Sequence, residues 1–261
     1  MSSPAPPLPV RVKAGYGSAE LGLTGIEVVI QIVLLKLYTE VVGLNANLAG
    51  LTLAGAVVWD AVVDPVVGAI SDRTRTTRQG KRRPFIAFGT PALSLAFLLL
   101  LSPPVLASQL GKAVFLFVAY ALVNTTIALA TVPHSALAGE LSGDPVERTE
   151  LFAWRFMFSN LGLVSAAVIL AVVDPDADPG ARMAYSPVAL ALGAVAVATA
   201  VVTLWATRGR DVPSMEPPAS LGVLARGLLS VLRTRPFLPL FAAFVIASIG
   251  RTVNASVALF Y

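Results

Sequence analysis

The sequence predicts an all-α membrane protein. Hydrophobic residues make up 56% of the 261 residues, charged residues only 13%, and the mean hydropathy is +0.78. A soluble domain with so little charge could not cover its surface, so lipid must be the solvent for much of the chain. Apolar runs near or above the ~20 residues that cross a bilayer as a helix recur along the sequence.

Seven such runs can be marked, and each is expected to form one membrane span. In chain order they are residues 16–42, 48–71, 85–102, 112–137, 147–173, 185–206 and 236–261. The connections are short, except for residues 207–235. Pro103 with Pro104, and the Asp- and Pro-rich stretch 174–180, are helix stops. The fifth helix is expected to begin at an Asp144 N-cap, with Pro145 in its first turn and Glu147 completing a capping box.

Positive charge is distributed unevenly between the two ends of these spans. One end has only Lys112 and Arg182. The other has Arg11, Lys13, Arg73, Arg75, Arg78, Lys81, Arg82, Arg83, Arg148, Arg208, Arg210, Arg226, Arg233 and Arg235. The positive-inside rule therefore places the tail 1–14 and the linker 207–235 in the cytoplasm, with the spans in the inner (plasma) membrane. Leucines at helical spacing predict an interfacial amphipathic helix within the linker: Leu221, Leu224, Leu228, Leu229 and Leu232.

Composition also excludes several classes of function. The formal charge is +4 and the pI is near 9.7, but the basic residues fall between apolar runs, which is a topology pattern and not a nucleic-acid-binding stripe. Cysteine is absent, so disulfides, thiolate metal sites and cysteine nucleophiles are excluded. No cofactor is expected beyond a coupling ion, and the partners expected are a small polar solute, a monovalent cation and the lipid bilayer.

Polar residues inside the spans are concentrated on four of the first six helices. The third and sixth spans carry only a few hydroxyls. The others carry Glu20, Thr24, Glu27 and Gln31 on the first, Asp60 and Asp64 on the second, Asn124, Thr131, His134 and Ser135 on the fourth, and Arg155, Ser159 and Ser165 on the fifth. Four helices around a wet cavity, within a six-helix bundle (15–206), form half of a transporter.

Asp60 and Asp64 are the strongest candidates for a cation site. Their i, i+4 spacing places both carboxylates on one side of the second span. Two neighbouring carboxylates in a low dielectric must share a proton, hold a cation or pair with a base. Pro65 removes one backbone hydrogen bond and can free a carbonyl as a further oxygen ligand. The alternative is a permanent ion pair with Arg155 that locks two helices together.

Arg155 lies roughly 16 Å into the bilayer, at ~1.5 Å per residue beyond the proposed cap. An arginine at that depth should face the cavity, where it either binds solute or serves as counter-ion to Asp60, Asp64 or Glu20. Glu20 faces the cavity by helical phase. His134, which follows Pro133 in a stretch of small residues, is expected to pack through hydrogen bonds more than to relay protons. Arg251 in the seventh span is also buried by sequence.

The basic loop after the second span is a candidate gate. Gly68 and Gly80 suggest a tight turn, and Asp72 could contact a helix N-terminus while Arg73, Lys81 and Arg82 satisfy carbonyl ends. Such contacts would hold one conformation of a transporter.

Several stretches resemble the major facilitator superfamily, and within it the glycoside–pentoside–hexuronide:cation symporters, the melibiose permease group. The loop from Gly68 through Asp72 to Arg82 is similar to the superfamily's motif between helices two and three. The narrower resemblance is carried by 38–44, 59–65, 71–74 through Pro84, 132–137 and 147–149.

The resemblance implies twelve helices in two halves, alternating access, and sugar uptake coupled to Na+, Li+ or H+. It implies a cation, or a metal ion if Na+ or Li+ is used, at Asp60 and Asp64, and it places Arg155 in the sugar pocket. Thr24 and Thr131 stand where the melibiose permease has sugar-binding aspartates, and Ser135 where it has a tryptophan. These departures disfavour a galactoside, while Val63 and Ala128 near the cation site favour H+ over Na+.

We therefore expect the N-terminal half of a cation-coupled symporter of a small, carbohydrate-like solute, which ends within the seventh span and lacks the C-terminal half that transport needs. Its expected solute site comprises Glu20, Thr24, Thr131 and Arg155. Two alternatives stay open: a non-transporting helical bundle or partner subunit, and a lysolipid carrier of the same family. An intramembrane protease is disfavoured, because both aspartates lie on one helix.

Overall fold

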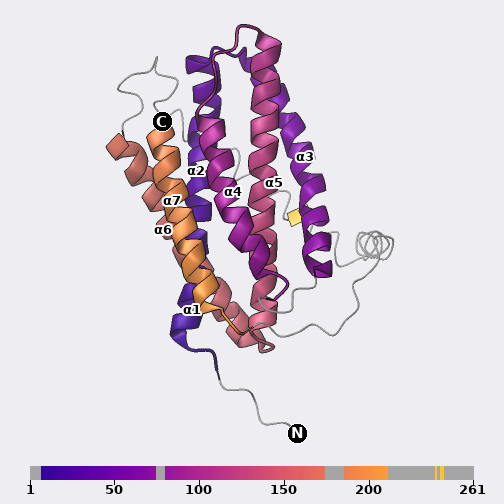
Figure 1. Cartoon of the computed structure of the whole chain (residues 1–261), viewed down its shortest axis with the longest axis vertical. Coiled ribbons are helices and arrows are strands. Elements are labelled where there is room, and N and C mark those ends of the chain that lie inside the picture. Colours follow the sequence, from indigo (N-terminus) through magenta and orange to yellow (C-terminus); the bar gives the residue numbers. More distant parts are fainter. Residues whose placement is uncertain (1–6, 75–79, 174–184, 211–238, 240–241, 244–261) are drawn as a thin grey trace. The chain divides into compact units, whose positions relative to one another are not determined.

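The six predicted spans of the N-terminal region form six apolar helical segments in a computed structural model of the chain (Figure 1). The structure describes residues 7–74, 80–173, 185–210, 239 and 242–243. Its helices are α1 (Val10–Gly17), α2 (Ala19–Lys36), η1 (Leu37–Val41), α3 (Ala46–Arg73), α4 (Arg83–Leu101), α5 (Gln109–Leu141), α6 (Pro145–Val173) and α7 (Ser186–Ala206). The all-helical prediction is confirmed for this region.

The first span is made of three consecutive helical pieces. α1 begins at Val10, within the segment 1–14 that the sequence assigned to a tail, and its Lys13 pairs with Glu150 of α6. Ser18 separates α1 from α2, and its hydroxyl donates to Gly15 O at 2.8 Å. At the other end, η1 is a π-helical turn in which Val42 N donates to Leu37 O at 2.9 Å.

The remaining helix ends follow their sequence signals. The Asn45 side chain caps α3 by accepting from Asn47 N at 3.0 Å, and Ser108 Oγ caps α5 by accepting from Gly111 N at 3.0 Å. Asp144 caps α6 through Val146 N at 3.0 Å. The expected capping box is wrong in its second half, because Glu147 turns instead to Ser142 Oγ, 2.6 Å from its Oε2.

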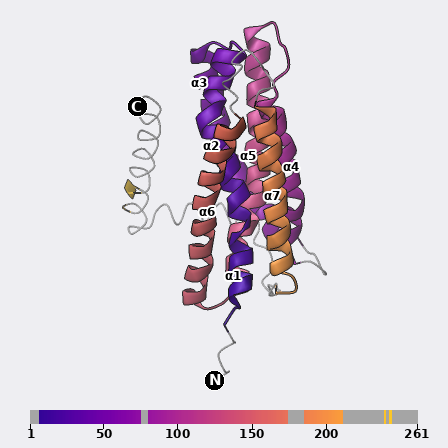
Figure 2. The same cartoon turned by 90° about the vertical axis from the view of Figure 1, so that its left-hand side faces the viewer.

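The helices pack side by side in an order that differs from their order in the sequence. α2 lies against α6 and α7, α4 lies against α7 and α5, and α3 lies against α5. The two views in Figures 1 and 2 show these neighbours running along one another. α2, α5 and α6 are therefore the elements that can bring Glu20, the α5 hydroxyls and Arg155 together.

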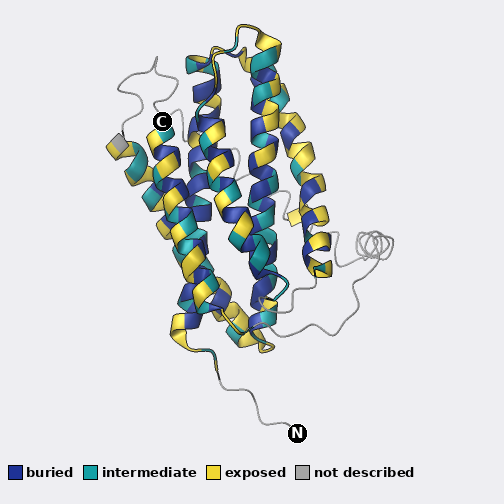
Figure 3. Cartoon of the chain, in the orientation of Figure 1, coloured by how far each residue is buried: buried dark blue, intermediate teal, exposed yellow. Residues whose placement is uncertain are grey.

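Burial differs between the helices and does not follow their polar content. The main apolar core is built largely from α2, α4, α5 and α7 and includes Ile26, Phe97, Leu116 and Leu192. α3 and α6 instead leave large apolar side chains exposed within this unit, as the yellow turns of α3 in Figure 3 show. These two helices carry Asp60, Asp64 and Arg155.

Several predictions fall outside the described residues. They are the amphipathic helix of the linker, the stretch 174–180, Arg251 and nearly all of the seventh span. Met215–Tyr261 forms a separate unit, of which only Pro239, Ala242 and Ala243 are described, each in helical conformation.

Close helix contacts depend on residues without side chains. A Cβ atom built on Gly22 of α2 would overlap the backbone of Ala196 in α7, and one built on Gly162 of α6 would overlap the Leu21 carbonyl of α2. Within lipid, where burial of apolar surface does not drive helices together, such close approach is a main source of association.

We therefore predict that Gly22→Ala lowers the stability of the bundle by about 1–3 kcal/mol, because the added methyl group forces α2 away from α7. Thermal unfolding of the purified chain in detergent measures the effect. Gly50→Ala is the control, since a Cβ there meets nothing within 4 Å, and alanine is the better helix former by about 1 kcal/mol. Equal stability of the two variants would contradict the packing account.

Candidate functional site

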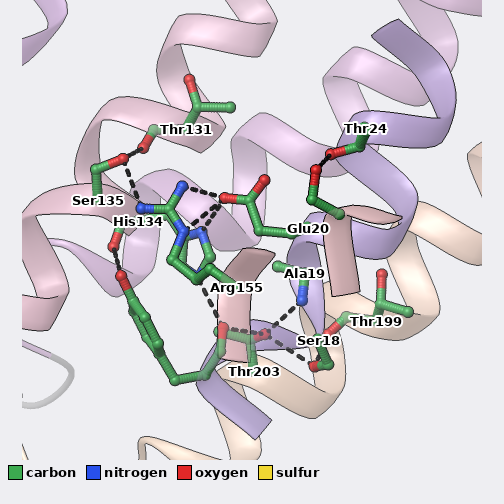
Figure 4. Close-up of polar contacts among 12 residues, drawn as sticks. Ser18, Ala19, Glu20, Thr24, Thr131, His134, Ser135, Arg155, Thr199 and Thr203 are labelled. Carbon is green, nitrogen blue, oxygen red and sulfur yellow. Dashed lines mark hydrogen bonds and ion pairs between the residues drawn. The ribbon is translucent and has the colours of Figure 1, made fainter. Parts of the chain in front are cut away.

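An ion pair between Glu20 of α2 and Arg155 of α6 forms the centre of the site (Figure 4). Arg155 Nε donates to Glu20 Oε1 at 2.7 Å, and Nη2 donates to the same oxygen. The two side chains are 14% and 13% exposed. Of the counter-ions considered for Arg155, the structure selects Glu20, so the predicted alternative of a lock with Asp60 and Asp64 is wrong.

Hydroxyl groups lie at this ion pair and on the adjoining turn. Arg155 Nη1 donates to Ser135 Oγ of α5 at 3.0 Å. Thr24 Oγ1, one turn beyond Glu20, donates to Ser159 Oγ of α6 at 3.0 Å. Figure 4 shows Glu20, Ser135 and Arg155 converging from three helices, with Thr24 to one side of them.

Thr131 joins this group only through its backbone. Its hydroxyl donates to Ile127 O of its own helix at 2.9 Å, while its carbonyl accepts from Ser135 Oγ at 2.8 Å. Of the four predicted solute-site residues, Glu20 and Arg155 are therefore in direct contact, Thr24 lies on the adjoining turn, and Thr131 contributes no side-chain bond to the pair.

His134 packs through hydrogen bonds, as predicted. Its ring is fully buried and lies 4.6 Å from the ring of Tyr16. Nε2 is 2.8 Å from the Tyr16 carbonyl oxygen, and the Tyr16 hydroxyl donates to the His134 carbonyl at 3.0 Å. Nδ1 lies 3.4 Å from Glu20 Oε1, so the histidine also borders the ion pair. Sequence reasoning missed Tyr16, although its i, i+4 spacing from Glu20 could have indicated it.

Asp60 and Asp64 lie together on α3, apart from the Glu20–Arg155 pair. Asp60 is half-buried and Asp64 is exposed within this unit. Asp60 interacts electrostatically with Asp64 and with Tyr120 of α5, and Tyr120 also interacts with Glu27 of α2. The sequence did not single out Tyr120.

The number of side chains that could ligate a cation limits what Asp60 and Asp64 can bind. No group of three or more His, Asp or Glu side chains that could hold a metal ion occurs among the described residues. Pro65 lies inside α3 and leaves the carbonyl four residues earlier, that of Ala61, without its helical partner. Two carboxylates and a free carbonyl suit a proton or a weakly held monovalent cation and do not suit a tightly chelated divalent ion.

The candidate gate is built around Arg82. Its side chain is buried and contacts three groups: Asp72 of α3, Ser71 Oγ at 2.5 Å, and Glu140 Oε1 of α5 at 3.1 Å. Lys81 lies 3.5 Å from the same Glu140 oxygen. These contacts tie the end of α3 to the end of α5. Glu140 was not predicted, because it lies three residues beyond the run that hydropathy marked.

The structure corrects two details of the predicted gate. Asp72 pairs with Arg82 and not with a helix N-terminus, while Arg83 takes the expected part of a basic residue that satisfies a carbonyl end, by donating to Leu204 O of α7. Gly80 adopts a left-handed φ of 72°, as a tight turn requires. Gly68 instead lies within α3, facing Val132. Arg73 is the exposed last residue of α3.

Comparison with known proteins places the chain in a family. Residues 15–261 match a family described as "MFS/sugar transport protein". The chain is 28% identical over 255 residues to a protein of Escherichia coli named "Putative glycoside/cation symporter YagG", covering 97% of this chain and 54% of that protein. It is 31% identical over 163 residues to the E. coli "Inner membrane symporter YicJ", covering 62% and 35%.

Another relative carries a different substrate in its name. The zebrafish (Danio rerio) "Sodium-dependent lysophosphatidylcholine symporter 1-A" is 34% identical over 131 residues, covering 50% of this chain and 24% of that protein. This chain spans about half the length, or less, of the curated relatives it matches.

Replacing Arg82 by methionine should destabilise the bundle by about 2–4 kcal/mol, because Glu140 and Ser71 lose a buried charged partner. Lys81→Met is the matched control, since it removes the same charge from the neighbouring residue but only one 3.5 Å contact. That change should cost less than about 1 kcal/mol. Chemical unfolding in detergent measures the stability of both variants. Similar losses of unfolding free energy would contradict the central role of Arg82 in the gate.

Proposed function

Because this chain belongs to the MFS/sugar transport protein family, we propose that it forms part of a cation-coupled symporter of a small polar solute, with a sugar or glycoside as the preferred class. The proposal concerns transport and not catalysis. Since the chain covers 54% of the length of YagG, the transporting unit is a longer carrier in which this bundle is one half.

The observation that carries the proposal is the largely buried Glu20–Arg155 pair, with Ser135 bonded to the guanidinium and the Thr24–Ser159 hydroxyl pair on the adjoining turn. An isolated charge has a high free-energy cost in a bilayer. A buried guanidinium with hydroxyl groups beside it therefore indicates a binding site for a polar solute. The planar fork of donors on Arg155 suits the paired oxygens of a sugar, with Glu20 and Thr24 as further hydrogen-bonding groups. Thr131 would line this site through its backbone.

We assign the coupling cation to Asp60 and Asp64. Binding of H+ or Na+ between two adjacent carboxylates relieves their mutual repulsion, so occupancy changes the free energy of any conformation that brings them closer or further apart. The gate formed by Gly68, Asp72, Arg73, Gly80, Lys81 and Arg82 would then hold one of these conformations.

We also propose that the N-terminus and the gate face the cytoplasm. The starts of α1, α4 and α6 and the ends of α3, α5 and α7 share one end of the bundle by topology, and this end carries Lys13, Arg82, Arg83 and Arg148. The positive-inside rule places that end in the cytoplasm.

The cation site is tested by replacing each aspartate singly by asparagine in a full-length relative that carries both. Cation-driven solute uptake should fall at least about tenfold in either variant, corresponding to loss of about 1.4 kcal/mol of cation binding. Glu40→Gln, a charge change at an exposed position of the same bundle, should leave uptake unchanged. Undiminished coupling in both aspartate variants would refute the assignment.

The solute site is tested by Arg155→Lys in the same carrier. The change keeps the charge and loses the bidentate fork, so half-saturation by solute should rise about tenfold or more while cation dependence is retained. Uptake is measured over a panel of glycosides, hexuronides and lysophospholipids. If the variant has an unaltered half-saturation concentration for every transported solute, Arg155 is excluded from the solute site. If the carrier takes up only lysophospholipid, the proposed solute class is wrong and the solute is a lipid.

A further inference from the structure

We propose that Glu20 and His134 together bind one proton, at a site separate from Asp60 and Asp64, and that this proton controls the hold of Glu20 on Arg155. The binding of the proton rests on the described contacts alone. Its part in coupling rests on the function proposed above.

The contact at Nε2 fixes which ring nitrogen carries hydrogen. Nε2 of His134 lies 2.8 Å from the Tyr16 carbonyl oxygen. A carbonyl oxygen can only accept a hydrogen bond, so Nε2 must be the donor. In the neutral ring the hydrogen is then on Nε2, and Nδ1 presents a bare lone pair.

That lone pair has no suitable partner. Nδ1 is buried without a hydrogen bond and lies 3.4 Å from Glu20 Oε1. An ionised carboxylate accepts and does not donate, so two acceptors face each other across a contact that is fully buried on the His134 side. Such an arrangement is costly until a hydrogen lies between the two atoms.

One added proton resolves this conflict. A hydronium ion delivers the proton and is left as a water molecule. The proton bonds either to the Nδ1 lone pair of His134 or to the carboxylate of Glu20, and the protonated group can then donate to the other. No other bond is made or broken, and release of the proton reverses the step. Glu20 and Arg155 sum to zero charge without this proton, and the cluster carries one positive charge with it.

The charged neighbours of His134 and the partial exposure of Glu20 determine how a proton reaches this site. Two titratable side chains contact His134, Tyr16 of α1 and Glu20 of α2, and Arg155 of α6 interacts with both of them. Two other helices pack against α5, and their charged groups bind elsewhere: Arg83 of α4 donates to Leu204 O, and Asp60 of α3 interacts with Asp64. His134 itself is sealed, whereas the Glu20 side chain is 13% exposed, so a proton reaches the pair through Glu20.

Protonation would loosen the ion pair. Arg155 donates to Glu20 Oε1 through both Nε and Nη2, and this is the same oxygen that faces Nδ1. A proton on the pair reduces the negative charge available to the guanidinium. The fork of Arg155 then becomes free to bind acceptors on a solute.

The chain has a single histidine, so the test can be made on the chain itself. The chain is purified in detergent through a histidine-free tag, with the imidazole labelled with ¹⁵N, and its spectrum is followed from pH 9 to pH 5, roughly the span in which a histidine changes charge. We expect a neutral ring with hydrogen on Nε2 at high pH and one protonation step at Nδ1. A ring with hydrogen on Nδ1, or a ring whose charge stays constant over the range, would overturn the proposal.

Glu20→Gln tests the part played by the carboxylate. The variant removes the negative charge and offers Nδ1 an amide hydrogen, so protonation of the ring should require at least about a tenfold higher proton concentration. Glu40→Gln is the control and should match the unmodified chain. Unchanged protonation in Glu20→Gln would overturn the proposal, and if that variant fails to fold, the spectrum of the unmodified chain still decides it. These outcomes concern proton binding and do not depend on whether the carrier transports a sugar.

Discussion

The guanidinium of Arg155 and the carboxylate of Glu20 could not each face lipid alone, because an uncompensated charge costs about 3 kcal/mol at the centre of a membrane helix. Their pairing therefore constrains the rest of the bundle. α2 and α6 must lie in contact, and α5 must present Ser135 to the same guanidinium. The glycines at the α2–α6 and α2–α7 contacts allow the close approach that this requires.

The acidic residues of the bundle fall into two kinds, according to whether they pair with Arg155. Glu20 is held by Arg155 and borders His134 inside the bundle. Asp60 and Asp64 lie on α3, a helix with much of its surface uncovered, and interact with one another. In the proposed carrier, Glu20 regulates the guanidinium that binds solute, while Asp60 and Asp64 take up the cation. Exchange of protons or cations at these places changes which polar groups are satisfied, and this change can be coupled to opening on either side.

Sequence reasoning predicted the helices well, because membrane-spanning length and charge asymmetry are strong signals that do not depend on packing. It could not choose the partner of Arg155, because helical phase places Glu20, Asp60 and Asp64 all toward the cavity and only the order of the packed helices decides among them. The same limit explains Glu140 and Tyr120, whose roles arise from neighbours distant in sequence. Thr131 shows the reverse case, in which a polar residue on the predicted face satisfies its hydroxyl within its own helix.

The most direct test of the account is an experimental structure of a full-length carrier containing this bundle, determined with its solute bound. The account predicts that Arg155 gives up at least one of its two hydrogen bonds to Glu20 and donates it to an oxygen of the solute. A solute bound elsewhere, with both bonds from Arg155 to Glu20 intact, would contradict it.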